Sequence, residues 1–111
     1  MKVYVKNLIL ANNVNKADTF ISRLVGLLDR KHLDISEGLL LMNCKSVHCF
    51  FMNFAIDVVY LSKNMTVLDI ETIYPWRIGK IVRNTANVLE LAEGAASILN
   101  KGDIIVFEEF I

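Results

Sequence analysis

Short hydrophobic runs separated by polar turns recur along most of the chain. Several of these runs are rich in β-branched and aromatic residues, which favour strands. The runs that predict strands are 3–10, 38–42, 47–53, 57–61, 66–73, 87–91 and 104–110. Residues with turn chemistry, such as those at 43–46 and 62–65, separate neighbouring runs. The pattern predicts a sheet-rich chain whose strands pair mainly in the antiparallel sense.

Two segments show a different pattern and predict helices. In the first, apolar residues recur at helical spacing, and Asn15 and Asp18 have the chemistry of a helix start. The stripe consists of Ala17, Phe20, Ile21, Leu24, Leu27 and Leu28. The second predicted helix is 95–99, and Gly102 suits its C-terminal cap. We therefore expect an α+β fold with a mostly antiparallel, partly closed β-sheet and two helices, forming a single domain over residues 1–111.

Gly102 and Asp103 carry a local prediction. A glycine adopts positive φ easily, and an acid that follows it can accept hydrogen bonds from nearby backbone N–H groups. The sequence "LNKGDIIVF" therefore predicts a tight turn at Gly102–Asp103, between the second helix and the last strand.

The composition narrows the function classes. Hydrophobic residues make up 54% of the 111 residues, which indicates either strands buried on both faces or an exposed partner surface. Lys plus Arg equals Asp plus Glu, and the basic residues are scattered, which argues against a nucleic-acid partner. No apolar run reaches the roughly 18 residues of a membrane-spanning helix. With no convincing signal peptide and no disulfide framework, we expect a cytoplasmic location.

The stretch "VHCFFMNFAIDVVYL" places polar residues among apolar ones. Cys44, His48 and Cys49 are metal-ligand types, but His48 and Cys49 would point to opposite faces of a strand. In one extended segment Cys44 and His48 would lie about 13 Å apart, too far to share an ion, and only a tight turn at 43–46 would bring them together. The opposite faces also separate the Cys49 thiol from a histidine base. We expect no metal, no other cofactor and no catalytic cysteine.

Asp57 and His48 each allow a structural and a catalytic interpretation. Asp57 opens a strand after an apolar approach, and a buried carboxylate needs partners. We favour a structural Asp57 that accepts backbone N–H bonds or pairs with an arginine, over a catalytic one. For His48 we favour a hydrogen-bonded or edge histidine over a general base.

Four motifs carry a resemblance to a known family. "RLVGLLDR", "HCFFMNFAIDVVYL", "VLELAEG" and "KGDIIVF" follow one another as in the domain-of-unknown-function 192 family, over roughly residues 23–107. That family has no accepted activity, so the resemblance implies no catalytic residue. The positions that match its polar motif residues are Arg23, Arg30, His48, Asp57, Glu90 and Asp103. Many relatives carry signal peptides, and some are similar to genes beside pilus or secretion machinery, which implies a link to the cell envelope.

Two function classes follow. The favoured one is a non-enzymatic binding or accessory module that takes a protein partner, a small ligand or a second copy of the chain. Trp76 beside Arg77 has the chemistry of an interface hot spot, and with Tyr74 it would line a groove, although a Trp that caps the core is equally compatible. The alternative is a small hydrolase that uses Asp57 and His48, with Arg23 as an anion partner. The candidate binding or structural residues are Arg23, His48, Asp57, Trp76, Arg77, Glu90 and Asp103.

Overall fold

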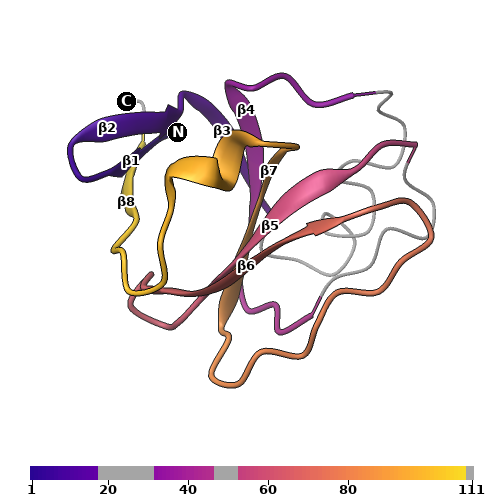
Figure 1. Cartoon of the computed structure of the whole chain (residues 1–111). Coiled ribbons are helices and arrows are strands. Elements are labelled where there is room, and N and C mark those ends of the chain that lie inside the picture. Colours follow the sequence, from indigo (N-terminus) through magenta and orange to yellow (C-terminus); the bar gives the residue numbers. More distant parts are fainter. Residues whose placement is uncertain (18–31, 47–52, 110–111) are drawn as a thin grey trace.

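The computed structural model describes residues 1–17, 32–46 and 53–109, which form two β-sheets (Figure 1). The smaller sheet has the order β2-β1-β8, with β1 at Lys2–Val5, β2 at Leu8–Ala11 and β8 at Val106–Glu108. The larger sheet has the order β3-β4-β7-β5-β6. Its strands are β3 (Asn13–Ala17), β4 (Glu37–Leu41), β5 (Ile56–Leu61), β6 (Val67–Ile73) and β7 (Asn87–Ala92).

The fold over the described residues is nearly all β, so the α+β prediction with two helices is wrong. Within residues 1–17, 32–46 and 53–109 the one helical element is the 3-10 helix η1 (Ala95–Ile98), a single short turn. It lies in the segment where the sequence predicts the second helix, which is too short to sustain an α-helix. Four of the predicted strands are observed almost as expected, as β4, β5, β6 and β7.

The start of the first predicted helix is a strand instead. Asn15, the expected N-cap, lies in β3 and is paired with Leu39 of β4 in the parallel register. All five residues of β3 are paired with β4, and Val14 is buried, so the sheet pairing outweighs the capping chemistry of Asn15. The rest of the predicted stripe, 20–28, lies outside the described residues.

The predicted strand 3–10 is a hairpin rather than one strand. Lys6 and Asn7 both have positive φ, 51° and 65°, as the two central residues of a type I′ turn require. Val5 and Leu8 are paired across this turn. At the other end of the chain, β8 is shorter than the predicted 104–110, because Ile104 makes only an isolated bridge with Thr66.

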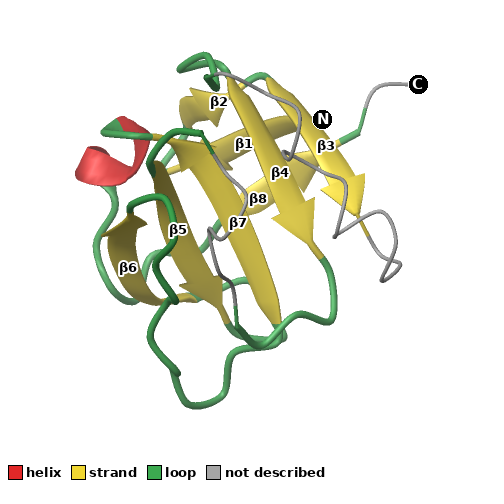
Figure 2. Ribbon diagram, turned by 90° about the vertical axis from the view of Figure 1, so that its right-hand side faces the viewer, coloured by secondary structure: helices red, strands yellow, loops and turns green. Residues whose placement is uncertain are grey.

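The central strands β5 and β7 are buried along their whole length. The smaller sheet lies behind the larger one in Figure 2, and η1 packs against β5 and β7. Strands covered on both faces have continuous hydrophobic sequences, as "IDVVYL" has apart from its aspartate. Gly38 in β4 allows a close approach to β7, since a Cβ there would lie 2.9 Å from Leu91 Cδ2. Much of the high hydrophobic content is therefore core.

Candidate functional site

Asp57 is a buried carboxylate at the second position of β5, and three hydrogen bonds hold it. Its Oδ2 atom accepts the backbone N–H groups of Gly94 at 2.9 Å and Ala96 at 3.0 Å. Its Oδ1 atom accepts the hydroxyl of Thr72 at 2.7 Å. Gly94 has φ of 90°, and that left-handed conformation is open to glycine without a Cβ penalty. Asp57 thus ties β5 to the first turn of η1 and to β6.

This arrangement bears on the hydrolase alternative. Both oxygens of Asp57 are engaged by fixed donors, so the carboxylate has the geometry of a structural acceptor rather than of a free general base. His48 and Arg23, the other two members of the alternative, lie outside the described residues. The convergence of these three residues on one cleft therefore stays a prediction.

Glu90 lies in the middle of β7 with apolar neighbours on its face of the sheet. It is paired with Val58 of β5 and with Leu39 of β4. The residue is only 8% exposed, and burial raises the pKa of its carboxyl from 4.5 to about 7. A carboxyl with this pKa changes its protonation near neutral pH.

Gly102 and Asp103 form the expected turn. Gly102 has φ of 91°, and the Asp103 N–H donates to the carbonyl oxygen of Asn100 at 3.1 Å. The Asp103 carboxylate accepts the Asn100 N–H at 2.8 Å and lies 3.4 Å from the ammonium of Lys6. The tight turn is confirmed. The C-cap of η1 is Leu99, however, so the prediction that Gly102 caps that helix is wrong.

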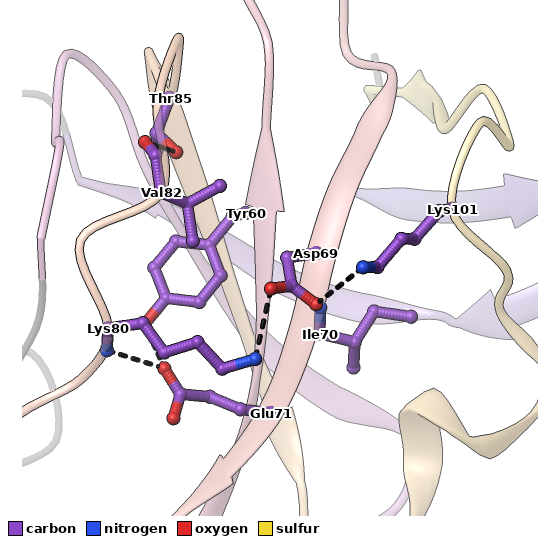
Figure 3. Close-up of polar contacts among 8 residues, drawn as sticks. All are labelled: Tyr60, Asp69, Ile70, Glu71, Lys80, Val82, Thr85 and Lys101. Carbon is purple, nitrogen blue, oxygen red and sulfur yellow. Dashed lines mark hydrogen bonds and ion pairs between the residues drawn. The ribbon is translucent and has the colours of Figure 1, made fainter.

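A polar network joins the edge strand β6 to the connection that follows it (Figure 3). The buried Tyr60 of β5 donates its hydroxyl to Glu71 Oε2, and the backbone N–H of Lys80 donates to the same oxygen at 2.7 Å. The ammonium of Lys80 donates to Asp69 Oδ2 at 3.0 Å, and Lys101 lies 3.7 Å from Asp69 Oδ1. Two carboxylates of β6 thus hold Lys80 by both its backbone and its side chain.

The charges in this network support one another. Burial, with the hydrogen bond to Glu71, raises the pKa of Tyr60 far above its usual range, so the phenol stays protonated and donates. The hydrogen bond from Lys80 lowers the pKa of Asp69, and the same bond raises the pKa of Lys80. The Asp69–Lys80 pair is therefore fully ionised at neutral pH.

The residues held by this network belong to the connection 74–86 between β6 and β7, called the β6–β7 loop below. It begins with a turn in which the Arg77 N–H donates to the Tyr74 carbonyl oxygen at 3.2 Å. Pro75 occupies the second position, and Trp76 occupies the third with φ of 67°, where type II turns favour glycine. A bulky residue with positive φ is rare and costs free energy, and such strain concentrates at functional sites.

The loop exposes a line of large apolar side chains. Tyr74 is 56% exposed, Trp76 64%, Ile78 69% and Ile81 92%. The same segment carries Arg77, Lys80 and Arg83 and has no acidic residue. Sequence reasoning selected Trp76 and Arg77 but missed the isoleucines and the Tyr60–Glu71 anchor. The signal it could have used was the absence of carboxylates from 74–86.

Three further observations concern other kinds of site. The described part of the chain contains no group of three or more His, Cys, Asp or Glu side chains that could hold a metal ion. Cys44 is half-buried, and its thiol donates to the Ser46 carbonyl oxygen at 3.1 Å, whereas Cys49 lies outside the described residues. Among the residues that the structure describes, no helix has the length and apolar character needed to cross a membrane.

Comparison with known proteins places the chain beside uncharacterised relatives. The model of the DUF192 family, described as "Uncharacterized ACR", matches residues 3–107. A UPF0127 protein of Pyrococcus horikoshii is 40% identical over 76 residues, which are 66% of each chain. A UPF0127 protein of Pyrococcus furiosus is 34% identical over 90 residues, 78% of each chain. A crystal structure of a protein of unknown function from Novosphingobium aromaticivorans has a TM-score of 0.78 at 19% identity, covering 96% of this chain and 84% of that one.

Proposed function

Since the chain belongs to the DUF192 family of uncharacterised proteins, we propose its function from its own surface: it is a non-enzymatic binding module. The β6–β7 loop is its contact surface. The observation that carries the proposal is the exposure of Trp76, Ile78 and Ile81 on a segment that hydrogen bonds hold in place. Large apolar side chains gathered on one exposed segment are typical of interaction sites.

The anchoring of the loop matters to binding as much as its composition. Glu71 fixes the backbone at Lys80, and the Thr85 hydroxyl donates to the Val82 carbonyl oxygen at 2.8 Å, which closes the end of the loop. A segment already held in one conformation loses little conformational entropy on binding. Together with the Tyr74–Arg77 turn at the start of the loop, these anchors present Trp76, Ile78 and Ile81 to a partner at low entropic cost.

The hydrolase alternative has weaker support. It requires Asp57 as a working acid or base, and the carboxylate is buried beneath three donors from Thr72, Gly94 and Ala96. Glu90 has a pKa suited to proton transfer, but its neighbours Leu39 and Val58 are apolar and offer no nucleophile. We therefore keep the binding module as the function. The cytoplasmic location, and the link to envelope or secretion machinery that the family resemblance suggests, stay predictions.

The experiment is photo-crosslinking in cells of the native host. A benzophenone amino acid is placed at Ile81 on the loop and, as the matched control, at Ile9 on β2, which is 55% exposed. Benzophenones insert into C–H bonds of proteins and lipids alike. We expect a discrete crosslinked species from position 81 and none from position 9. Crosslinks that are equal at both positions, or absent from position 81, would overturn the proposal.

A further inference from the structure

The charge of the β6–β7 loop identifies the kind of partner that fits it. The whole chain has zero net charge, whereas residues 74–86 have three cations and no carboxylate. Lys80 is paired with Asp69, which leaves exposed Arg77 and Arg83 to act on a partner. The loop therefore combines large exposed aliphatic and aromatic side chains with positive charge.

Two more cations lie at the Arg83 end of the loop. The Cys44 N–H donates to the Ala86 carbonyl oxygen at 3.0 Å, and the Ala86 N–H donates to the Leu61 carbonyl oxygen at 2.9 Å. These bonds bring the connections 42–46 and 62–66 beside the end of the loop, with exposed Lys45 and Lys63. Neither connection contains an acidic residue. Figure 1 shows the loop, in orange, running along the lower border of the molecule beside the 42–46 connection.

We propose that the β6–β7 loop docks on an anionic lipid surface, an inference that rests on the loop being the contact surface of the module. Trp76, Ile78 and Ile81 enter the interfacial region of the bilayer, and Arg77 and Arg83 face the anionic headgroups. Trp residues prefer this interface, aliphatic side chains gain by leaving water, and cations near an anionic leaflet are attracted to it. The protein then lies on the membrane without crossing it.

The observations favour lipid over the other polyanions and over a protein partner. A single-stranded nucleic acid would need several aromatic platforms for its bases, whereas this loop exposes Ile78 and Ile81 beside its two aromatic residues. A protein interface buries its apolar anchors in pockets of the partner. Ile81, which is 92% exposed and has an arginine two residues away, suits a deformable apolar phase that adjusts to the side chain.

Trp76 is the only tryptophan of the chain, so its fluorescence reports on the environment of the loop. The purified protein is mixed with vesicles of phosphatidylcholine alone, or of phosphatidylcholine with phosphatidylglycerol. We expect a blue shift of the Trp76 emission, and quenching by brominated acyl chains, with the anionic vesicles only. Co-sedimentation of the protein with the vesicles gives the partition coefficient, which should fall as salt is added.

Variants distinguish the contributions of charge and apolar contact. Replacing Arg77→Gln and Arg83→Gln should lower the partition coefficient about five-fold for each cation removed. Replacing Ile81→Ser should lower it about ten-fold or more, since an aliphatic side chain no longer leaves water. Ile9→Ser is the matched control and should leave the partition coefficient unchanged. Circular dichroism melting of each variant checks that it is folded.

Failure of the lipid inference and failure of the proposed function are distinguishable. Equal binding to neutral vesicles, no binding to anionic ones, or binding that the double arginine variant retains in full would overturn the lipid inference. If position 81 nevertheless crosslinks a discrete protein in cells, the module stands and its partner is that protein. If position 81 crosslinks nothing and vesicles do not bind, both proposals are wrong.

Discussion

At the scale of single residues, Asp57 joins three pieces of structure through one carboxylate. It accepts hydrogen bonds from the hydroxyl of Thr72 on β6 and from two backbone N–H groups at the start of η1. A buried donor left without a partner costs about 1–3 kcal/mol. Asp57, a polar residue in an apolar strand, thus links β5 to β6 and to η1.

We predict that Asp57→Ala lowers the free energy of unfolding by roughly 1–3 kcal/mol, because the donors of Thr72, Gly94 and Ala96 lose their acceptor. Asp57→Asn should cost less. Its amide oxygen can accept the two backbone N–H groups while its NH₂ donates to the Thr72 hydroxyl. Thermal unfolding measures both changes. A normal melting temperature in both variants would show that Asp57 has no structural role.

Glu90 makes a prediction about pH. Its carboxyl has an ordinary pKa of 4.5 and a folded-state pKa of about 7, so the folded protein binds this proton more tightly than the unfolded chain. The stability associated with protonated Glu90 is fully present below pH 4.5 and is lost as the pH rises through about 7. The loss amounts to roughly 3 kcal/mol, because each pKa unit corresponds to about 1.4 kcal/mol.

Glu90→Gln should therefore be more stable than the natural chain at pH 8 and similar to it at pH 5. The measurement is urea denaturation of both proteins at each pH, with the difference in free energy of unfolding compared between the two conditions. Asp57→Asn is a useful comparison, since it changes a buried carboxylate elsewhere in the sheet. If Glu90→Gln shifts stability by the same amount at pH 5 and pH 8, Glu90 does not titrate in this range.

At the scale of elements, the β6–β7 loop is held chiefly by Glu71. Its Oε2 atom accepts both the buried Tyr60 hydroxyl and the Lys80 backbone N–H. The ion pair between Asp69 and the half-exposed side chain of Lys80 contributes less, since water screens the attraction between exposed charges. The shape of the loop thus depends on a carboxylate of the neighbouring strand.

We predict that Glu71→Ala loosens the loop more than it weakens the sheet. Amide hydrogen exchange at Lys80 should become faster by a larger factor than exchange in β7, because the Lys80 N–H loses its acceptor and the loop then opens locally, whereas β7 follows only the global stability. The free energy of unfolding should fall by roughly 1–3 kcal/mol as the Tyr60 hydroxyl loses its partner. Glu93→Ala, which removes an exposed carboxylate, is the control. Unchanged exchange at Lys80 would contradict the anchoring role.

The strands were more predictable than their connections. Segments such as 57–61 and 87–91 are largely apolar on both faces, apart from Asp57, Asn87 and Glu90. The sequence records this directly, because both faces are buried. The predicted helix start at Asn15 was wrong because capping chemistry is local, whereas the parallel pairing of β3 depends on β4, a strand distant in the sequence. The sequence could not show that Glu71 and Asp69 accept hydrogen bonds from Lys80, because these contacts form only when the chain folds back along β6.

At the scale of the whole molecule, the hydrophobic content divides between a core and a surface. The sequence left buried strands and a partner surface open as explanations. The buried strands are observed, and the partner surface stays a proposal. β5 and β7 are buried throughout, and the β6–β7 loop remains exposed. Charge divides in a similar way, because the connections around the loop contain cations without acids in a chain of zero net charge. The β6–β7 loop is therefore a surface on which exposed apolar and basic side chains coincide.

The final prediction separates binding from stability at Trp76. This residue is 64% exposed and has φ of 67°, a conformation that glycine adopts without strain. Trp76→Gly should therefore keep or slightly raise the free energy of unfolding, by up to about 1 kcal/mol, while it removes the largest side chain of the contact surface. Trp76→Ala should likewise weaken association with anionic vesicles more than it lowers the free energy of unfolding. Co-sedimentation with the vesicles measures association, and chemical denaturation of the same samples measures the free energy of unfolding. If the variants lose stability but associate with vesicles as before, Trp76 packs against the core. The contact surface would then lie elsewhere.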